Sequence, residues 1–282
     1  ICGRTTHPQR LIPGGFSKIP SKEELKSLKE RLQSAVPEIK TLAEFIKTLK
    51  ENIPDFVRET EYIALVHPEE YALYDGDIGS TLCEPTPVSN YRSWTNEYVV
   101  PHSTAKYTKH LKESYMAGAL ARFNINYNKL SPEAKEIAEM FGLKPICYNP
   151  YMNTIAQLVE AMDSLIVSVR IIDELLNDPE YKYTPPTYTI KPGTGAGSVE
   201  VPRGILFHEY SFDENGRCTM ANLIIPTNQN HANIQLDMEA LVPKLIEAGK
   251  DEKQIELALE MLVRAYDPCI SCSTHYLQVE FV

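Results

Sequence analysis

The chain has 282 residues, and 43% of them are hydrophobic, which is enough for a folded core rather than a disordered chain. It carries 28 Lys and Arg against 38 Asp and Glu, a formal net charge of −10 at pH 7 with no long basic block, so nucleic-acid binding is not expected. No apolar run reaches the roughly 18 to 20 residues that a membrane-spanning helix needs, and no signal-like segment opens the sequence. We expect one domain over residues 1–282, with no membrane span.

The first long pattern is helical and follows a Gly/Pro-rich opening. Ser21 to Glu24 has the S-x-x-E form of a capping box, which places a helix start at Ser21. Apolar residues then recur at helical spacing between residues 25 and 49, but Pro37 falls inside the pattern. The sequence therefore predicts either two helices or one kinked helix.

The middle of the chain predicts short strands followed by a long helix. β-branched and aromatic residues in Tyr62–Val66 and Tyr71–Tyr74 favour small strands, and the segment is broken by Asp-Gly and Pro. Between Thr154 and Asn177, apolar residues form one wide helical face, which ends before Pro179. We expect this helix to lie in the core.

The last third predicts a loop, a hairpin and a final helix. Residues 181–197 are rich in Pro, Gly and Thr and are expected to form a loop, and residues 205–212 and 218–225 read as the two strands of a hairpin. A helix from about residue 251 to residue 266 is broken by Asp267-Pro268. Together the elements predict a mostly α member of the α+β class.

The strongest chemical signal comes directly after that final helix. Asp267 to His275 places Cys269, Cys272 and an imidazole within nine residues. A C-x-x-C turn can direct two sulfurs at one metal, and thiolates suit nickel, iron, zinc or copper(I) rather than magnesium or calcium. On these residues alone, a structural zinc site or two thiols without metal is as well supported as a catalytic metal.

The remaining cysteines do not complete a zinc site or a disulfide framework. The six cysteines stand at positions 2, 83, 147, 218, 269 and 272. Only the last two are closely spaced, so a secreted, disulfide-rich protein is not indicated. A reducing compartment, the cytoplasm, fits this cysteine usage.

Several segments in the same order resemble the large subunits of nickel-iron hydrogenases. The C-terminal segment has that family's D-P-C-x-x-C-x-x-H form. The other similar segments are Gly3–Pro8 with Pro13–Gly15, Tyr71–Asp77, Gly195–Gly204 with His208, and Ile225–Asn230. The segment Tyr71–Asp77 is similar to the cytoplasmic branch that includes sulfhydrogenases and deazaflavin-non-reducing enzymes. The resemblance covers residues 1–275, the C-terminal two thirds of such a subunit.

The resemblance implies a set of metal ligands in the buried interior, at an interface between subunits. Cys269 would be a terminal nickel ligand and Cys272 would bridge nickel and iron, both as thiolates, because a bound cation stabilises deprotonated sulfur. His275 would correspond to a ligand of a nearby structural magnesium ion. The iron of such a centre carries carbon monoxide and cyanide.

The resemblance also implies roles for four residues around the metals. Arg203 would lie over the open metal position. There its planar, permanently charged guanidinium would polarise dihydrogen or hydrogen-bond a cyanide on iron, and it suits both tasks better than Lys would. Asp267 would pair with Arg203. Thr227 would donate a hydrogen bond to a cyanide, and Pro226 would shape the dry pocket.

Without the family match, each of these residues has an ordinary structural interpretation. An arginine after a proline is more often a surface ion-pair residue, and a threonine in a turn usually caps its own backbone. His7, His208 and His231 are expected to be structural or to support the site rather than bind metal.

The match departs from the family at the N-terminal cysteine pair. The family holds nickel with four cysteines, two of them in a C-G-x-C motif, whereas Ile1 to Thr5 has threonine at the second sulfur position. Two thiolates leave nickel under-ligated, so we expect the chain to be inactive alone. Three explanations of the missing pair remain: a truncated chain, a separate N-terminal half, or a decayed homologue kept for assembly. The alternating pattern of Tyr276–Val282 predicts a strand-like tail.

The implied function is reversible heterolytic cleavage of dihydrogen, with Cys269 or Arg203 as the base for the proton. Electrons would leave through the iron-sulfur small subunit of a hydrogenase and further electron-transfer subunits, because this chain has no spare group of cysteines for a cluster. One rival is the quinone-reducing relative that has lost its nickel cysteines, against which Cys269 and Cys272 speak. The other is a non-catalytic scaffold or structural-zinc homologue.

Overall fold

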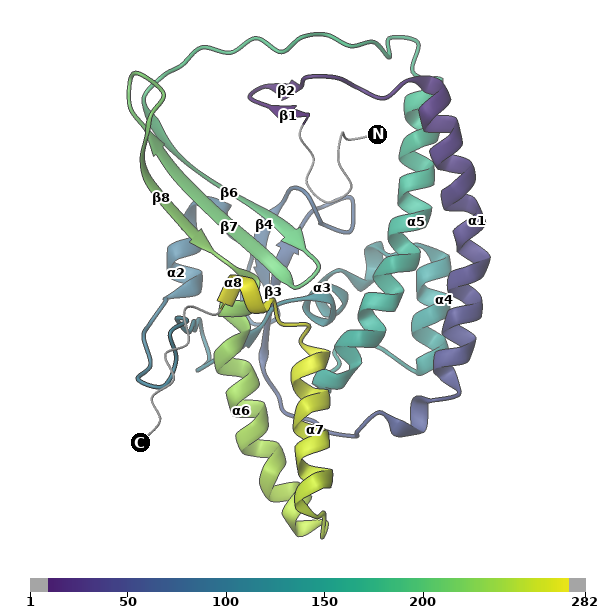
Figure 1. The fold of residues 1–282 in the computed structure, drawn as a ribbon, viewed down its shortest axis with the longest axis vertical. Coiled ribbons are helices and arrows are strands. Elements are labelled where there is room, and N and C mark those ends of the chain that lie inside the picture. Colours follow the sequence, from purple (N-terminus) through teal and green to yellow (C-terminus); the bar gives the residue numbers. More distant parts are fainter. Residues whose placement is uncertain (1–9, 274–282) are drawn as a thin grey trace.

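The computed structural model describes residues 10–273 of the chain and combines long helices with three small β-sheets (Figure 1). The α-helices are α1 (Lys22–Lys47), α2 (Tyr91–Thr95), α3 (Ala119–Asn126), α4 (Pro132–Phe141), α5 (Asn153–Asn177), α6 (Pro226–Glu247), α7 (Glu252–Ala265) and α8 (Ile270–Ser273). The strands are β1 (Leu11–Ile12), β2 (Gly15–Phe16), β3 (Glu61–Val66), β4 (Asp77–Ser80), β5 (Tyr115–Met116), β6 (Gly193–Val201), β7 (Gly204–Phe212) and β8 (Cys218–Ile224). Short 3-10 helices lie at Lys50–Asn52, Val88–Asn90, Tyr127–Lys129 and Pro150–Met152. The expected α+β class with a helical majority is confirmed.

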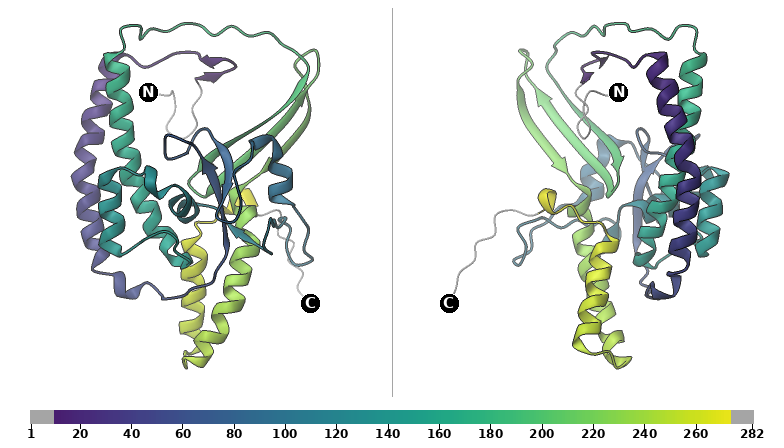
Figure 2. Two further views of the ribbon diagram at one scale, coloured as in Figure 1. Left: turned by 180° about the vertical axis from the view of Figure 1, so that it is seen from behind. Right: turned by 45° about the vertical axis from the view of Figure 1, so that its right-hand side comes forward.

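Helix α1 begins where the capping box predicted. The Ser21 hydroxyl accepts a hydrogen bond from the Glu24 amide at 3.1 Å, and the Glu24 carboxylate accepts one from the Ser21 amide at 2.8 Å. The helix continues through Pro37, so the pattern forms one helix rather than two. Helices α1 and α5 lie side by side and form one edge of the molecule (Figures 1 and 2).

Helix α5 confirms the expected core helix, and the main hydrophobic core lies between it and the shorter helices. Ile155, Val159 and Met162 of α5 pack with Leu120 and Phe123 of α3 in this core. Helix α3 is the central element of Figure 1, between α5 and the sheets. It therefore connects the helical side of the molecule to the strands.

A second core forms under the strands. β3 pairs antiparallel with β4 and parallel with β5, and their apolar residues pack with Ile205 and Phe207 of β7 and with Trp94 of α2. The strand predicted at Tyr71–Tyr74 is wrong, because these residues form a connection between β3 and β4. Tyr71 instead donates a hydrogen bond from its hydroxyl to Glu160 at 2.7 Å.

The expected hairpin is confirmed as β7 and β8, but the loop predicted at residues 181–197 is only partly correct. β6 begins at Gly193 and pairs with β7 from Gly193 opposite Phe212 to Val201 opposite Gly204. The first residues of β6 are glycine-rich and largely exposed, so they lack the apolar alternation that marks a strand. Residues 193–197 therefore form a strand through backbone pairing with β7, although their side chains do not predict one.

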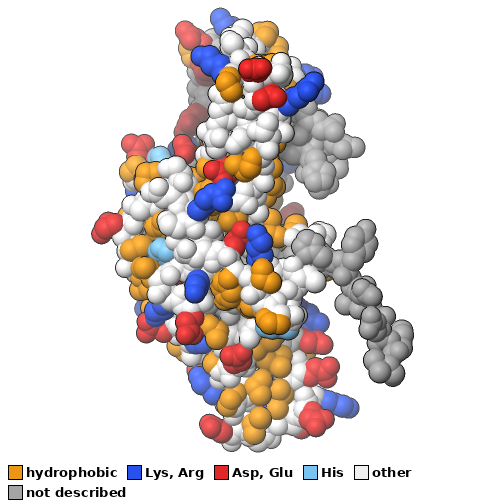
Figure 3. Space-filling view, turned by 90° about the vertical axis from the view of Figure 1, so that its left-hand side faces the viewer, with side chains coloured by type: hydrophobic (Ala, Val, Ile, Leu, Met, Phe, Trp, Pro, Cys, Tyr) orange, Lys and Arg blue, Asp and Glu red, His pale blue; other side chains and the backbone are white. Residues whose placement is uncertain are grey.

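The sequence pattern gave no sign of the long helix that begins at Pro226. Helix α6 runs from Pro226 to Glu247, and several of its buried residues are polar, so it lacks an apolar stripe. The α6–α7 hairpin extends away from the rest of the chain, and Figure 3 shows hydrophobic side chains gathered over that end. None of the helices within residues 10–273 is long and apolar enough to cross a membrane.

Candidate metal centre

The site begins where α7 ends. A second capping box, between Asp251 and Gln254, starts this amphipathic helix. At its other end the buried Tyr266 hydroxyl donates to Asp237 at 2.5 Å and accepts from Asn233 at 2.6 Å, both on α6. These bonds fix the last turn of α7 against α6, so the residues that follow leave from a defined point.

Asp267 turns the chain sharply at that point. Its φ is +51°, in the left-handed region that aspartate tolerates better than most residues do. Pro268 follows, and without an N–H it cannot continue a helix. The backbone is thereby redirected from α7 into Cys269 and the short helix α8.

The two cysteines of the C-x-x-C segment converge. Their Sγ atoms lie 2.6 Å apart, and the Cys272 amide donates to the Cys269 carbonyl at 3.2 Å. Cys269 is half-buried and Cys272 is exposed, which differs from the expected burial of both. The reason is the position of α8, which lies at the surface of the described chain, next to the start of α6, rather than inside either core (Figures 1 and 2).

Hydrogen bonding shifts the pKa values of the two thiols in opposite directions. Bonds with Cys272 and Ser271, followed by the positive charge of Arg203, hold the pKa of the Cys269 thiol below its ordinary value. The same bond with Cys269, together with desolvation, raises the pKa of Cys272. Their shared hydrogen bond therefore favours a thiolate at Cys269 over a thiolate at Cys272.

Arg203 and Asp267 meet beside the cysteines. Arg203 lies in the tight turn between β6 and β7, and its Nε donates to the Asp267 carbonyl at 2.5 Å while Nη2 donates to Oδ1 at 3.1 Å. Gln157 of α5 donates to the other oxygen of that carboxylate at 3.2 Å. The pairing that the resemblance implied is present, and it places a fixed positive charge next to the two sulfurs.

Thr227 connects the start of α6 to the cysteines. Its buried hydroxyl accepts a hydrogen bond from the Cys269 amide at 3.0 Å, and Pro226 precedes it as the first residue of α6. A hydroxyl has one proton and two lone pairs, so Thr227 can still donate while it accepts this bond. Proline suits the first position of a helix because its missing N–H is not needed there.

The structure thus brings together residues that are far apart in the sequence. Six of the seven predicted site residues lie in one corner: Pro226, Thr227, Arg203, Asp267, Cys269 and Cys272. His275 lies outside the described residues, as do His7 and the tail Tyr276–Val282. Of the other histidines, His208 makes a 2.7 Å hydrogen bond with Tyr210 on β7, and His231 is partly buried on α6.

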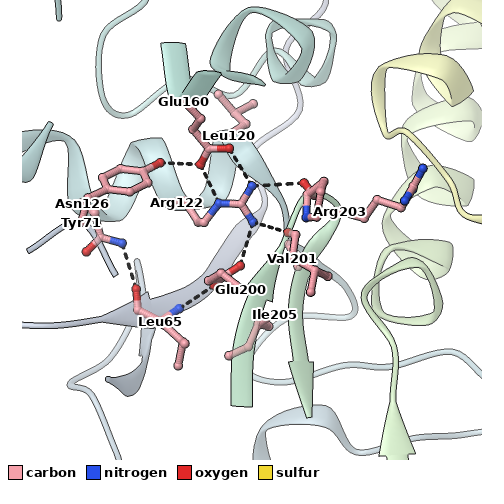
Figure 4. Close-up of polar contacts among 12 residues, drawn as sticks. Leu65, Tyr71, Leu120, Arg122, Asn126, Glu160, Glu200, Val201, Arg203 and Ile205 are labelled. Atoms are coloured by element: carbon pink, nitrogen blue, oxygen red, sulfur yellow. Dashed lines mark hydrogen bonds and ion pairs between the residues drawn. The ribbon is translucent and has the colours of Figure 1, made fainter. Parts of the chain in front are cut away.

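Sequence reasoning missed the residues that hold the Arg203 turn. Arg122 on α3 forms ion pairs with Glu160 of α5 and Glu200 of β6, beneath that turn (Figure 4). The available signal was a single arginine inside the apolar run Met116–Phe123, a placement that requires charged partners when the helix is buried. Its partners lie 38 and 78 residues further along the chain, and no local pattern identifies them.

The donor set fits part of a soft-metal site. Two adjacent sulfurs can hold one thiophilic ion or bridge two. Within residues 10–273, no group of three or more His, Cys, Asp or Glu side chains is arranged to hold a metal. A closed tetrahedral zinc site needs four ligands, so the described residues supply two thiolates and leave the other ligands to come from elsewhere.

The fold and the site together define the class of protein. Residues 69–275 match the family model of nickel-dependent hydrogenases, so the chain belongs to that family. It is 31% identical over 280 residues to the alpha subunit of sulfhydrogenase 1 of Pyrococcus furiosus, covering 98% of this chain and 64% of that protein. It is also 31% identical over 297 residues to a subunit of the F420-non-reducing hydrogenase of Methanothermobacter thermautotrophicus, covering 97% of this chain and 61% of that protein. The suspected branch of the family is confirmed.

Solved structures support the same fold. A crystal structure of an NAD+-reducing [NiFe]-hydrogenase in the H2-reduced state superposes with a TM-score of 0.77 at 23% identity, over 95% of this chain and 63% of the other. The Ni-Fe-Se hydrogenase of Desulfovibrio vulgaris Hildenborough gives a TM-score of 0.64 at 18% identity, over 97% of this chain and 66% of the other. The chain therefore spans less than two thirds of the length of these relatives.

Proposed function

We propose that the chain is the C-terminal part, as one domain, of the catalytic large subunit of a nickel-iron hydrogenase, which oxidises dihydrogen reversibly to protons and electrons. The observation that carries the proposal is the pair of sulfurs 2.6 Å apart at Cys269 and Cys272, next to the Arg203–Asp267 pair. The membership of the chain in the nickel-dependent hydrogenase family supports the assignment of these residues to the metal site.

The metals themselves would be held by the two thiolates from this chain. When bound, a nickel-iron centre with carbon monoxide and cyanide on iron would supply the redox site at which dihydrogen is split. Cys269 would be a ligand of nickel, and Cys272 would be the second ligand that this chain supplies to the nickel-iron centre. His275, beyond the described residues, would bind a magnesium ion.

The surrounding residues would handle the proton and the charge. Cys269 is the first candidate to receive the proton at Sγ, because its neighbours favour the deprotonated thiolate, and Arg203 in its neutral guanidine form is the second candidate. The Asp267 carboxylate keeps the guanidinium oriented toward the site. The Thr227 hydroxyl has its proton available for a cyanide, and Pro226 would limit water at this side.

The partners follow from what the chain does not supply. Two more thiolates would have to come from a separate N-terminal half of the large subunit or from a longer form of this polypeptide. Electrons would leave through the iron-sulfur small subunit of the hydrogenase and further electron-transfer subunits in the cytoplasm. Relatives named as sulfhydrogenase and F420-non-reducing hydrogenase subunits support an assembly of this kind.

The test is metal analysis and infrared spectroscopy of the purified complex. Nickel and iron near one atom each per chain, with bands of iron-bound carbon monoxide and cyanide, would support the proposal. Zinc, or no metal, with those bands absent would favour the non-catalytic scaffold or structural-zinc homologue and would sink the hydrogenase assignment. Uptake of dihydrogen with an artificial electron acceptor is the matching activity measurement.

A further inference from the structure

Arg122 uses every N–H of its guanidinium on fixed partners. Nε and Nη2 donate to the two carboxylate oxygens of Glu160 at 2.6 and 2.7 Å, and Nη1 donates to Glu200 at 2.7 Å. The two remaining protons go to backbone carbonyls, from Nη1 to Val201 at 2.9 Å and from Nη2 to Pro202 at 3.1 Å. The residue is 1% exposed, so the five N–H groups of an arginine are all engaged inside the protein.

Those two carbonyls directly precede Arg203. Figure 4 shows Arg122 reaching the strand end at Val201 from one side while the Arg203 side chain points away toward α8. The Arg203 side chain bonds to Asp267 and is 36% exposed, so it is not enclosed by neighbours. The position of its guanidinium therefore depends on where the turn holds its backbone.

The other face of the turn is held by close backbone packing. Gly204 has φ +134°, and a Cβ there would lie 2.7 Å from the Ala117 side chain. Asn230 of α6 donates to the Ala117 carbonyl at 3.1 Å and to the Arg203 carbonyl at 3.5 Å. The turn is thus fixed between Arg122 and the segment that opens α3.

The two carboxylates around Arg122 are themselves anchored. Glu160 accepts from the Tyr71 hydroxyl at 2.7 Å, and Glu200 accepts from the Leu65 amide of β3 at 2.8 Å. Burial raises the pKa of Glu200, while the charge of Arg122 opposes that change. Three elements, α3, α5 and β6, therefore meet at one guanidinium that holds the strand end before Arg203, and β3 anchors Glu200 beside it.

We propose that Arg122 is a positioning residue for Arg203: it clamps the β6–β7 turn through the carbonyls of Val201 and Pro202 and so fixes the guanidinium on Asp267, beside the segment that carries the two cysteines. The catalytic consequence rests on the proposed hydrogenase function. The mechanical part, the clamp on the turn, can be tested without any metal.

Lysine is the informative replacement for Arg122 because it keeps the positive charge and loses the planar guanidinium with its five N–H donors. An ammonium has three donors on one atom and cannot serve two carboxylates and two carbonyls that surround a planar group. Arg122→Lys is expected to keep one positive charge beside Glu160 and Glu200 but to release the carbonyls of the turn. Arg92→Lys is the control, because Arg92 also pairs with a carboxylate, that of Glu209 on β7, at a distance from the turn.

Hydrogen exchange of the purified full chain tests the clamp. Arg122→Lys should speed exchange in peptides covering residues 199–206 by about ten-fold, while peptides from α1 stay unchanged and Arg92→Lys has no effect on the turn. Wild-type exchange at the turn in Arg122→Lys would overturn the proposal. If that variant does not fold, a triple variant, R122M with E160Q and E200Q, removes the clamp together with the buried charges. Faster exchange at the turn of that variant supports the clamp, and an unchanged rate overturns it.

The loaded complex tests the consequence for catalysis. Arg122→Lys should keep its nickel and iron and a KM for dihydrogen within about two-fold, while kcat falls about 10- to 100-fold and the infrared cyanide bands shift or broaden. A loosened turn with unchanged kcat and bands would show that Arg122 does not position a catalytic group. A wild-type complex without metal or infrared bands would refute the hydrogenase function and leave the exchange result standing.

Discussion

The two arginines at the β6–β7 turn show how differently the same side chain can be used. Arg122 is buried and gives all its donors to fixed acceptors, whereas Arg203 gives two bonds to Asp267 and keeps part of its side chain exposed at the surface that carries Cys269. All the N–H groups of Arg122 are used, so its surroundings, which we call the saturated corner, serve to hold structure. Within the described residues, the corner around Arg203 offers two sulfurs and a partly exposed guanidinium but no full set of metal ligands, and we call it the incomplete corner.

The largest expected effect is at the incomplete corner. Cys272→Ser should reduce the nickel and iron of the purified complex and its dihydrogen uptake to background, because a hydroxyl is a poor ligand for soft metals. The free energy of unfolding of the chain should change by less than about 0.5 kcal/mol, since the side chain is exposed. Cys218→Ser, at an exposed cysteine of β8, is the control. Full metal content in Cys272→Ser would erase the contrast between the corners.

The next effect separates charge from geometry at Arg203. Arg203→Lys should lower dihydrogen oxidation about 100-fold with nickel and iron retained, because the ammonium keeps the charge but not the fork. Stability should change by less than about 1 kcal/mol, as for other partly exposed ion pairs. The measurements are kcat, metal content and thermal unfolding, with exposed Arg217→Lys as the matched control. Activity that stays at the wild-type level would argue against a role for this guanidinium.

The saturated corner should respond in stability instead. Gly204→Ala places a Cβ 2.7 Å from the Ala117 side chain at φ +134°, so the free energy of unfolding should fall by about 2–4 kcal/mol. Gly193→Ala at the other end of the β6–β7 pairing meets no atom of the described residues within 4 Å and should cost less than about 0.5 kcal/mol. Urea unfolding of both variants makes the comparison. Equal losses would mean that the close packing at the turn is not what stabilises it.

The smallest effect is a pH dependence of stability at His231 on α6. Burial lowers the pKa of His231 on α6 below its ordinary 6.5, so the unfolded chain binds a proton more readily than the folded one as pH falls through 6.5. Wild-type stability should therefore decline from pH 7.5 to pH 5.5 more steeply than that of His231→Gln. Thermal unfolding at the two pH values measures the difference, and parallel declines would contradict it.

The sequence predicted elements whose signals are local. The capping box at Ser21, the apolar face of Thr154–Asn177 and the hairpin after Gly204 each depend on neighbours within a few residues, and each appears in the structure. The chemistry after α7 was also predictable, because both thiols and Asp267 stand within six residues. The family resemblance added Arg203 and Thr227, which no local pattern would connect to them.

The parts that could not be predicted depend on contacts distant in sequence. Helix α6 buries Asn228, Gln229, Asn230 and Asn233, whose amides bond to other elements, so its helical period is hidden from a hydrophobicity pattern. The clamp at Arg122 needs partners from α5 and β6 that only the folded chain brings together. The aromatic residues of Tyr71–Tyr74 wrongly predicted a strand, because the Tyr71 hydroxyl instead donates a hydrogen bond to Glu160 of α5.

The left-handed backbone of Asp267 carries a consequence for variation at this position. The conformation at φ +51° favours Gly, Asn and Asp, whereas β-branched side chains are strained there. Asparagine would keep the fold of the turn but remove the negative charge that Arg203 meets, and glycine would remove the side chain as well. A series of Asn, Gly and Val at residue 267 would therefore report, in one position, how much of the site is shape and how much is charge.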